Sequence, residues 1–427
     1  MDLALSNYPS VRTAQAQVAA ASANIGLART AYLPRLDLLY HENRATTNNI
    51  FGQLFPQTVI PSLTGPVLPT HSFRSTFGSA GGVLLSWEPF DFGVRKGQVD
   101  VTRAITEQAN VGVEVTRLDV ATSAADAFLG TLASQEAVRA AEANVSREQV
   151  FADAVHVLVK NGLRAGADSA RVDAELSAAR NQLNLAQQTT EISRAALAEA
   201  LGTPGSFVII DAGSLLDLPP DTTVPMTDLE SHPLALAQKA AIETVRARER
   251  VLDRSYFPRF YLQSSFSSRG SGALNDGSFR GGRHGLLPDT SNYAVGMSVT
   301  FPAFDFFSIR ARRRIEEGNE GIERARLEQT IQGLKGQYAR AQALIDGSLR
   351  IAQETPNQLK AAQDAERLTR ERYRYGLANV TEVAEAQRLL AQAEIDNAVA
   401  RLNVWRALLV AARLQGDLKP FLRRVKY

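Results

Sequence analysis

Several features that mark common classes of protein are missing from this sequence of 427 residues. Cysteine is absent, which excludes a disulfide framework, a thiolate metal site and a cysteine nucleophile. No run of about 18 apolar residues exists, so we expect no transmembrane helix. Aromatic residues make up only 7%, too few for a large core of ordinary composition. The formal net charge of +2 argues against a protein that binds nucleic acid through bulk electrostatics.

Signals for catalysis are also scarce. None of the five histidines has the spacing of a metal-ligand pair, and we find neither a phosphate-cradling glycine motif nor a nucleophile elbow. We therefore expect no enzyme, no cofactor and no metal site. The first residues, Met1-Asp2-Leu3-Ala4, lack the basic and apolar regions of a signal peptide. Either the protein is cytosolic, or its targeting segment is not in this sequence; the features below favour the second.

The strongest positive feature is an internal repeat. A helical stretch between Pro9 and Tyr32-Leu33-Pro34-Arg35 recurs about 224 residues later, between Pro233 and Tyr256-Phe257-Pro258-Arg259. This period is too long for a solenoid, so it indicates one plan that is duplicated in tandem.

Two further pairs of motifs repeat at a spacing of about 214 residues. Phe90-Asp91-Phe92 is matched by Phe304-Asp305-Phe306, and Gly162-Leu163 is matched by Gly376-Leu377. The repeats predict four segments along the chain: a first repeat at 1–202, a linker at 203–229, a second repeat at 230–416 and a tail at 417–427.

Each repeat contains two stretches in which apolar residues alternate with small or polar ones, the pattern of a strand with two different faces. These predicted strands cover about residues 33–42 and 75–88, and about 257–268 and 291–302. A long polar loop joins the strands of each pair. A long helical pattern then follows, at about 94–201 and about 309–415, and a glycine turn divides each into a helical hairpin.

Strands of about ten residues with one apolar face are typical of outer-membrane barrels. A bilayer cannot hydrogen-bond a sheet edge, so four strands from one chain must close with those of other chains, and three chains would supply twelve. Aromatic residues cluster where strands meet helices, as in the interfacial girdle of a membrane protein. They are Trp87, Phe90, Phe92, Phe301, Phe304 and Phe306. The alternative is two soluble hairpins packed on helices.

This ordered, repeated set of motifs resembles the TolC-type outer membrane efflux proteins, also called outer membrane factors, over essentially the whole chain. The most specific marks are the repeated Pro-helix-Pro-Arg unit, the aromatic-Asp-aromatic step into each long helix and the Gly-Leu turns. The resemblance implies a mainly α-helical homotrimer with a membrane β portion: a 12-stranded β-barrel continued by a 12-helix α-barrel across the periplasm.

The function that the resemblance implies is a passive exit duct for tripartite efflux or type I secretion. Its location would be the bacterial outer membrane, in contact with outer-membrane lipid and reaching into the periplasm. A periplasmic adaptor (membrane fusion protein), coupled to an inner-membrane transporter, would dock on the hairpin tips and open the duct. By the same resemblance, Gly162-Leu163 and Gly376-Leu377 match the tips that contact the adaptor.

The resemblance also assigns residues of the periplasmic entrance. Glu382 and Glu385 fall where family members carry a ring of carboxylates, which selects for cations. Asp168 is the equivalent of Glu382 in the first repeat, and Tyr373 matches a tyrosine of the closed gate. Some members carry a gate arginine at the position of Ala378.

Arg164 in the first tip has the spacing to replace that arginine. The alternative for Glu382 and Glu385 is two solvated helix carboxylates. For the whole chain, the alternatives are a soluble helical scaffold or coiled-coil interaction protein and a periplasmic adaptor. Adaptors generally contain one helical hairpin per chain, so the duplication argues against the second of these.

Overall fold

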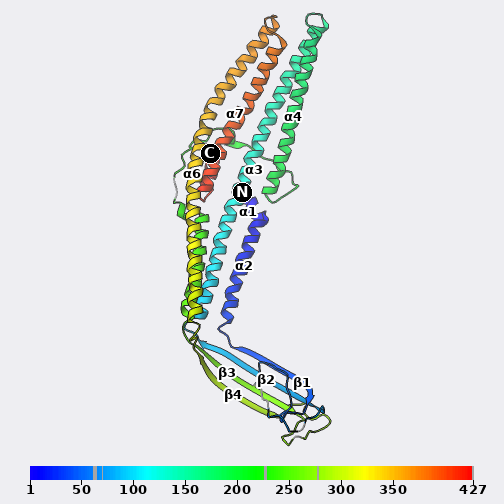
Figure 1. Cartoon of the computed structure of the whole chain (residues 1–427). Coiled ribbons are helices and arrows are strands. Elements are labelled where there is room, and N and C mark those ends of the chain that lie inside the picture. The colour runs from blue at the N-terminus through cyan, green and yellow to red at the C-terminus, as the bar shows by residue number, and fades with distance from the viewer. Residues whose placement is uncertain (61–64, 70, 226–227, 277, 426–427) are drawn as a thin grey trace. The chain divides into compact units, whose positions relative to one another are not determined.

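The computed structural model describes residues 1–60, 65–69, 71–225, 228–276 and 278–425 (Figure 1). The chain is mainly helical with one small sheet. Its helices are α1 (Asp2–Asn7), α2 (Pro9–Thr30), α3 (Val94–Lys160), α4 (Gly166–Ala200), α5 (Pro233–Arg254), α6 (Phe306–Arg374), α7 (Val380–Leu414) and α8 (Lys419–Val425), and its strands are β1 (Arg35–Thr46), β2 (Ser75–Phe90), β3 (Arg259–Ser271) and β4 (Thr290–Thr300). None of the described helices has both the length and the apolar character needed to cross a membrane.

The elements lie close to the segments expected from the sequence, with shifts at their ends. β1 continues to Thr46, beyond the expected end at 42, because it stays paired with β2 as far as Ser75. Similarly, α6 begins at Phe306 and not at 309. The backbone carbonyl of Asp305 accepts a hydrogen bond from the N–H of Ile309 at 2.8 Å, which adds a first turn to the helix.

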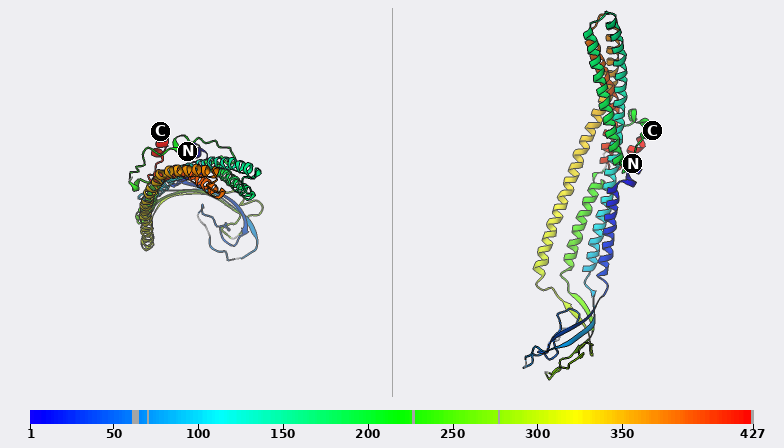
Figure 2. Two further views of the ribbon diagram at one scale, coloured as in Figure 1. Left: turned by 90° about the horizontal axis from the view of Figure 1, so that it is seen from above. Right: turned by 90° about the vertical axis from the view of Figure 1, so that its right-hand side faces the viewer.

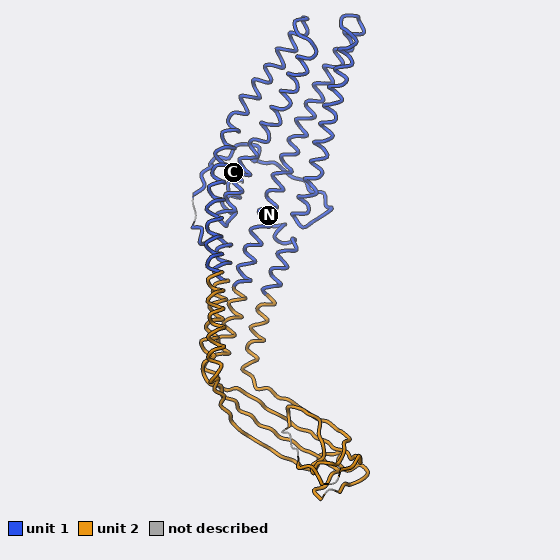
Figure 3. Tube along the Cα trace, in the orientation of Figure 1, with its two compact units in different colours: residues 1–18, 108–240, 323–427 blue, residues 19–107, 241–322 orange. Residues whose placement is uncertain are grey.

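The chain forms two compact units (Figure 3). Unit 1 contains residues 1–18, 108–240 and 323–427, and unit 2 contains residues 19–107 and 241–322. Each unit takes a part of both repeats. The compact units therefore cut across the expected segments 1–202, 203–229, 230–416 and 417–427, which stay a prediction about the repeats along the chain.

Unit 2 contains the sheet, in which all neighbouring strands are antiparallel and the order is β1-β2-β3-β4. The four strands run side by side in a single layer (Figures 1 and 2). Among the described residues, the outer edges of β1 and β4 pair with no further strand.

The two faces of this sheet differ in chemistry. The register places one row of large apolar residues across all four strands: Leu38, Val83, Phe266 and Tyr293. The next row, on the opposite face, is Leu39, Gly82, Ser267 and Asn292. Successive residues of a strand point to opposite faces, so the alternation seen in the sequence becomes one apolar face and one face of mostly small and polar side chains.

Unit 1 holds the ends of the two helical hairpins, α3/α4 and α6/α7. Its largest apolar cluster surrounds the buried Trp405 of α7, whose indole N–H donates to the carbonyl of Asp217 at 2.9 Å. Leu215 and Phe421 join this cluster from the segments that follow each repeat. The inter-repeat segment and the C-terminal helix therefore complete the core beside α7. A second apolar cluster lies near the hairpin tips.

Candidate functional site

The two hairpin tips have the same local structure. Gly162 and Gly376 have φ of +68° and +75°, in the left-handed region where a side chain is disfavoured. The next residue in each tip donates its N–H to a carbonyl five positions back: Leu163 to Leu158 at 2.9 Å, and Leu377 to Arg372 at 2.8 Å. This bond pattern closes the C-terminus of a helix in a Schellman motif. Both tip leucines are 67% exposed, so each turn presents an apolar side chain to solvent.

Tyr373 is only 3% exposed and packs in the apolar cluster behind the tips. Its ring lies edge-on to that of Phe151 at 5.3 Å. The guanidinium of Arg164 lies 4.5 Å from the centre of the tyrosine ring and donates to the Tyr373 carbonyl at 3.1 Å. Arg164 thus contacts the tyrosine that the family resemblance matched to the closed gate, and Ala378 is buried in the same cluster. Burial raises the pKa of the Tyr373 hydroxyl.

Of the three carboxylates expected at the entrance, Asp168 and Glu382 lie in the first turns of α4 and α7, and Glu385 lies in the second turn of α7. Asp168 is half-buried in the first turn of α4. Glu382 forms a capping box with Asn379: its backbone N–H donates to Asn379 Oδ1 at 2.9 Å, and its own side chain accepts from the Asn379 N–H at 3.3 Å. Glu385 pairs with Arg388. Glu382 therefore helps to cap the N-terminus of α7, which is compatible with a further role at an entrance.

A polar cluster that sequence reasoning missed lies between the two hairpins. Glu148 of α3 and Gln387 of α7 are 5% and 0% exposed. The carboxamide of Gln387 lies against both carboxylate oxygens of Glu148, and in the orientation that turns its nitrogen toward them it donates to both, at 2.9 and 3.0 Å. Burial raises the pKa of Glu148 to about 7, and the negative charges of Glu175 and Glu366 add to the rise, against the influence of Arg147. Glutamates are frequent in helices, so the sequence spacing of Glu148 did not distinguish it from the solvent-exposed glutamates of the same helix.

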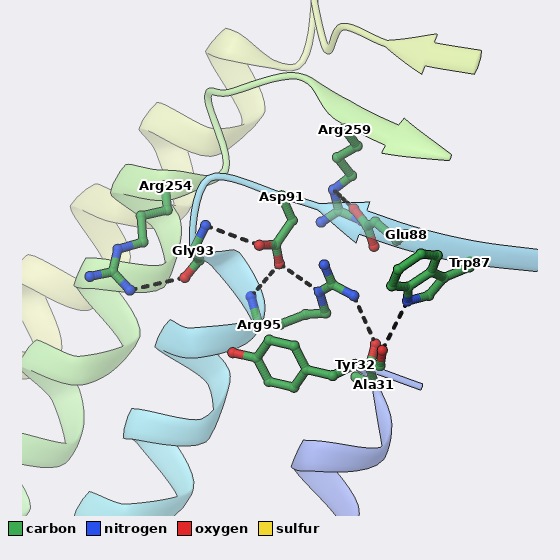
Figure 4. A network of polar contacts seen from close by, with 9 residues as sticks. All are labelled: Ala31, Tyr32, Trp87, Glu88, Asp91, Gly93, Arg95, Arg254 and Arg259. Atoms are coloured by element: carbon green, nitrogen blue, oxygen red, sulfur yellow. Dashed lines mark hydrogen bonds and ion pairs between the residues drawn. The ribbon is translucent and has the colours of Figure 1, made fainter. Parts of the chain in front are cut away.

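The first strand–helix junction, in unit 2, contains a buried ion pair (Figure 4). The Nε of Arg95 lies 2.9 Å from Asp91 Oδ2, and both side chains are almost fully buried. Asp91 also accepts from the backbone N–H groups of Gly93 and Arg95, at 3.0 and 2.6 Å. Burial disfavours the Asp91 carboxylate, but the hydrogen bonds from Arg95 and Gly93 outweigh it and lower the pKa.

This ion pair ties the end of β2 to the segment that precedes β1. Arg95 donates to the carbonyl of Ala31 at 3.1 Å and lies over the ring of Tyr32. The Trp87 indole donates to the Tyr32 carbonyl at 3.0 Å, and Arg254 of α5 donates to the Gly93 carbonyl at 2.9 Å (Figure 4). One arginine and one aspartate thus fix the geometry at which β2 becomes α3.

The six aromatic residues expected at a membrane interface all lie at strand ends or at the start of α3 or α6. In the first junction, the Phe92 ring stacks on that of Phe257 at 5.1 Å and meets that of Phe90 at 4.6 Å. In the second junction, Phe301 and Phe304 are more exposed than Trp87 and Phe90, and Phe306 contacts Tyr256. The aromatic residues therefore gather at one end of the sheet.

Within the described ranges, no group of three or more His, Asp or Glu side chains is arranged to hold a metal ion.

Comparison with known proteins gives consistent matches along the chain. The family model of outer membrane efflux proteins matches residues 1–203 and 225–415. The chain is 22% identical to the pyoverdine export outer membrane protein OpmQ of Pseudomonas putida, over 97% of this chain and 84% of that protein. It is 23% identical to nodulation protein T of Rhizobium leguminosarum bv. trifolii, over 91% of this chain and 79% of that protein.

Solved structures show the same fold at low sequence identity. The CusC channel has a TM-score of 0.78 at 16% identity, covering 97% of this chain and 91% of the other. The Campylobacter jejuni CmeC outer membrane channel has a TM-score of 0.76 at 16% identity, covering 100% of this chain and 88% of the other. Both halves of the sequence match one family, whose members are efflux channels and not enzymes, and the fold agrees. The chain belongs to the outer membrane efflux protein family.

Proposed function

We propose that this chain is one protomer of a trimeric duct in the bacterial outer membrane, through which a solute exported by an inner-membrane transporter leaves the cell. The observation that carries the proposal is the four-stranded sheet with one apolar face and two unpaired edges. A sheet of this kind cannot remain open in a bilayer, because each unpaired backbone group there costs several kcal/mol.

Closure between copies of the chain satisfies both edges at once. The edge of β4 in one protomer pairs with the edge of β1 in the next, and three protomers close a barrel of twelve strands. The row that contains Leu38 and Tyr293 then faces lipid, and the row that contains Gly82 and Ser267 faces the lumen. The six interface aromatics gather at one end of this apolar face, as an interfacial girdle does. A soluble scaffold would leave the apolar face in water, which argues against that alternative.

The helical part provides the periplasmic entrance and its docking points. Leu163 and Leu377 are apolar, exposed and presented by rigid turns, which suits contact with a periplasmic adaptor. Around the entrance, Asp168, Glu382 and Glu385 from three protomers form the carboxylate rings, and these favour cations over anions. Passage is passive, and the tips open when the adaptor docks. OpmQ is a pyoverdine exporter by name; a similar role in export is proposed here for the chain, with its cargo left to experiment.

Closure by β1–β4 pairing is tested with introduced cysteines, because the chain has none of its own. Leu39→Cys is combined with Asn292→Cys, Ala294→Cys or Gly296→Cys, since the stagger between protomers selects one of these positions. The protein is oxidised in detergent and separated on denaturing gels. One combination is expected to give covalent trimers, and each single variant serves as the control. If every combination stays monomeric, the proposed closure is wrong.

The entrance assignment is tested by conductance in planar bilayers. Wild-type protein is expected to give small, cation-selective openings, and the Glu382→Gln/Glu385→Gln variant to lose most of that selectivity. Unchanged selectivity in the variant would keep the duct and remove these residues from its entrance. Absence of any conductance from a trimeric wild-type protein would contradict the duct.

A further inference from the structure

The two hairpins of unit 1 meet through a polar layer next to the tip cluster. Glu148 lies on α3, four residues before Ala152 of that cluster, and Gln387 lies on α7, four residues after Val383. Residues four apart are neighbours on a helix face, so the Glu148–Gln387 contact lies about one turn from these two residues of the cluster. It joins the first hairpin to the second.

Charged groups from α3, α4 and α6 act on Glu148. Its neighbour Arg147 is engaged elsewhere, in a two-pronged contact with Glu394 of α7 at 2.9 and 2.7 Å. On α4 the nearby charge is Glu175, and on α6 it is the buried Glu366.

Glu366 in turn has its Oε1 3.5 Å from Nε of Arg370. Gln387, the partner on α7, is neutral. Both arginines thus pair with other acids, and within the described ranges Glu148 forms no ion pair of its own, although the charge of Arg147 favours its ionised form.

The neutral partner allows two states of this contact. When Glu148 is ionised, the carboxamide of Gln387 turns its nitrogen toward the carboxylate and donates to both oxygens. When Glu148 is protonated, its O–H can donate to the amide oxygen after a half-turn of the carboxamide. Both states keep the hairpins in contact, but the ionised one places a charge in a buried layer, next to a neutral amide and two further carboxylates.

We propose that Glu148 and Gln387 form a proton-dependent latch between the two hairpins, closed most firmly when Glu148 is protonated and loosened when it ionises. This inference rests on the proposed duct function, in which movement of one hairpin relative to the other opens the entrance. The ligand of the latch is a proton, and the group that receives it is the Glu148 carboxylate.

The sign and size of the effect follow from linkage. In the packed layer the pKa of Glu148 is about 7, whereas a hydrated glutamate has a pKa of 4.5. Raising the pH therefore favours any arrangement in which water reaches Glu148. Between about pH 5.5 and about pH 8, these two pKa values shift the equilibrium toward the loosened arrangement by about 25-fold per protomer.

The first test is the open probability of the wild-type channel in planar bilayers across this pH range. We expect openings to increase as the pH rises, with a midpoint near 7. Glu148→Gln should open rarely at every pH, because its neutral amide imitates the protonated acid. Glu142→Gln is the matched control, because Glu142 is on the same helix and exposed, and it should behave like wild type. An equal pH response in wild type and Glu148→Gln overturns the latch but leaves the duct intact.

A second readout does not depend on conductance and separates the latch from the duct. Amide hydrogen exchange around Glu148 and Gln387, corrected for the intrinsic effect of pH, should be faster at high pH in wild type but not in Glu148→Gln. The pH midpoint of this change in exchange should rise in Gln387→Leu, because the variant removes donors to the ionised Glu148. It should fall in Glu175→Gln, because that variant removes a like charge. A purely structural role would not move the midpoint in opposite directions, so equal midpoints in the two variants overturn the proposal.

Discussion

The same aromatic-Asp-aromatic motif lies in two different surroundings in unit 2. In the first copy, Asp91 is buried, is bonded to Arg95 and to backbone N–H groups, and fastens β2 to α3. In the second copy, Asp305 is exposed, and the structure as described records only backbone-carbonyl contacts for it, from Ile309 and Ser308. The difference follows from position: β2 has a neighbour on both sides, whereas β4 is an edge strand.

The comparison shows how a duplicated motif serves two purposes. In the first copy, which follows the inner strand β2, Arg95 pairs with Asp91 and connects the start of α3 to the segment before β1. In the second copy the equivalent residue is the buried Ile309, and Phe304 is left 89% exposed. An exposed aromatic group at a sheet edge suits contact with another protomer or with the membrane interface. The first junction is therefore held together by contacts within the chain, and for the second we propose contacts between chains.

The largest expected effect separates the two aspartates. Asp91→Ala leaves Arg95 buried without its partner, and removal of one member of a buried ion pair typically lowers the free energy of unfolding by about 3–5 kcal/mol. Asp305→Ala alters an exposed side chain and should change the free energy of unfolding by less than about 1 kcal/mol. Thermal unfolding followed by circular dichroism in detergent measures both. Equal losses in the two variants would mean that the junctions do not differ in the way described.

The pH dependence of the same pair sharpens the contrast. The pKa of Asp91 is lowered in the folded chain, so the stability that its ionised form contributes is complete above the unfolded value of 3.8 and is lost as the pH falls through the lowered value. Wild type should lose more stability than Asp91→Asn between about pH 5 and about pH 3. The measurement is the unfolding midpoint in denaturant at each pH, with Asp305→Asn as the control. Parallel pH profiles for wild type and Asp91→Asn would contradict a stabilising role of the ionised Asp91.

A smaller effect distinguishes the aromatic residues. Phe92→Ser removes a ring that packs against Phe257 and Phe90 in the same chain, so we expect a loss of about 1–3 kcal/mol in the free energy of unfolding. Phe304→Ser removes an exposed ring and should leave the fold of the chain intact but weaken the trimer. Native mass spectrometry in detergent reports the trimer, and circular dichroism reports the fold. Dissociation of Phe92→Ser with an unchanged fold would reverse the roles assigned to the two copies.

Much of this architecture could be read from the sequence because it depends on local signals. Alternation in residues such as Tyr293 and Val295 marks the strands, and Gly162 and Gly376 mark the turns, since few other residues accept a positive φ. The difference between Arg95 and Ile309 was also visible in the sequence. The structural consequence of this difference could not be predicted, because the repeat does not indicate which copy forms the edge of the sheet.

The contacts between hairpins could not be read in this way. Arg164 meets Tyr373, and Glu148 meets Gln387, across more than 200 positions of sequence. Such pairs depend on how helices are rotated and staggered against each other, which helical periodicity alone does not specify. The expectation that Arg164 takes the place of a gate arginine came from its spacing within one tip. The structure adds the contact between Arg164 and Tyr373.

The smallest expected effects concern the tips, where the two repeats should behave alike. A side chain added at Gly162 or Gly376 meets no atom within 4 Å, so the only cost is the left-handed backbone, about 1 kcal/mol in each case. Gly166→Ala is the control, because it also meets nothing within 4 Å but has no positive φ, and it should be neutral or slightly stabilising. Hydrogen exchange of the tip amides measures all three. Since the tips repeat the same turn in the same exposure, a much larger effect at one glycine would show that their surroundings differ as those of the junctions do.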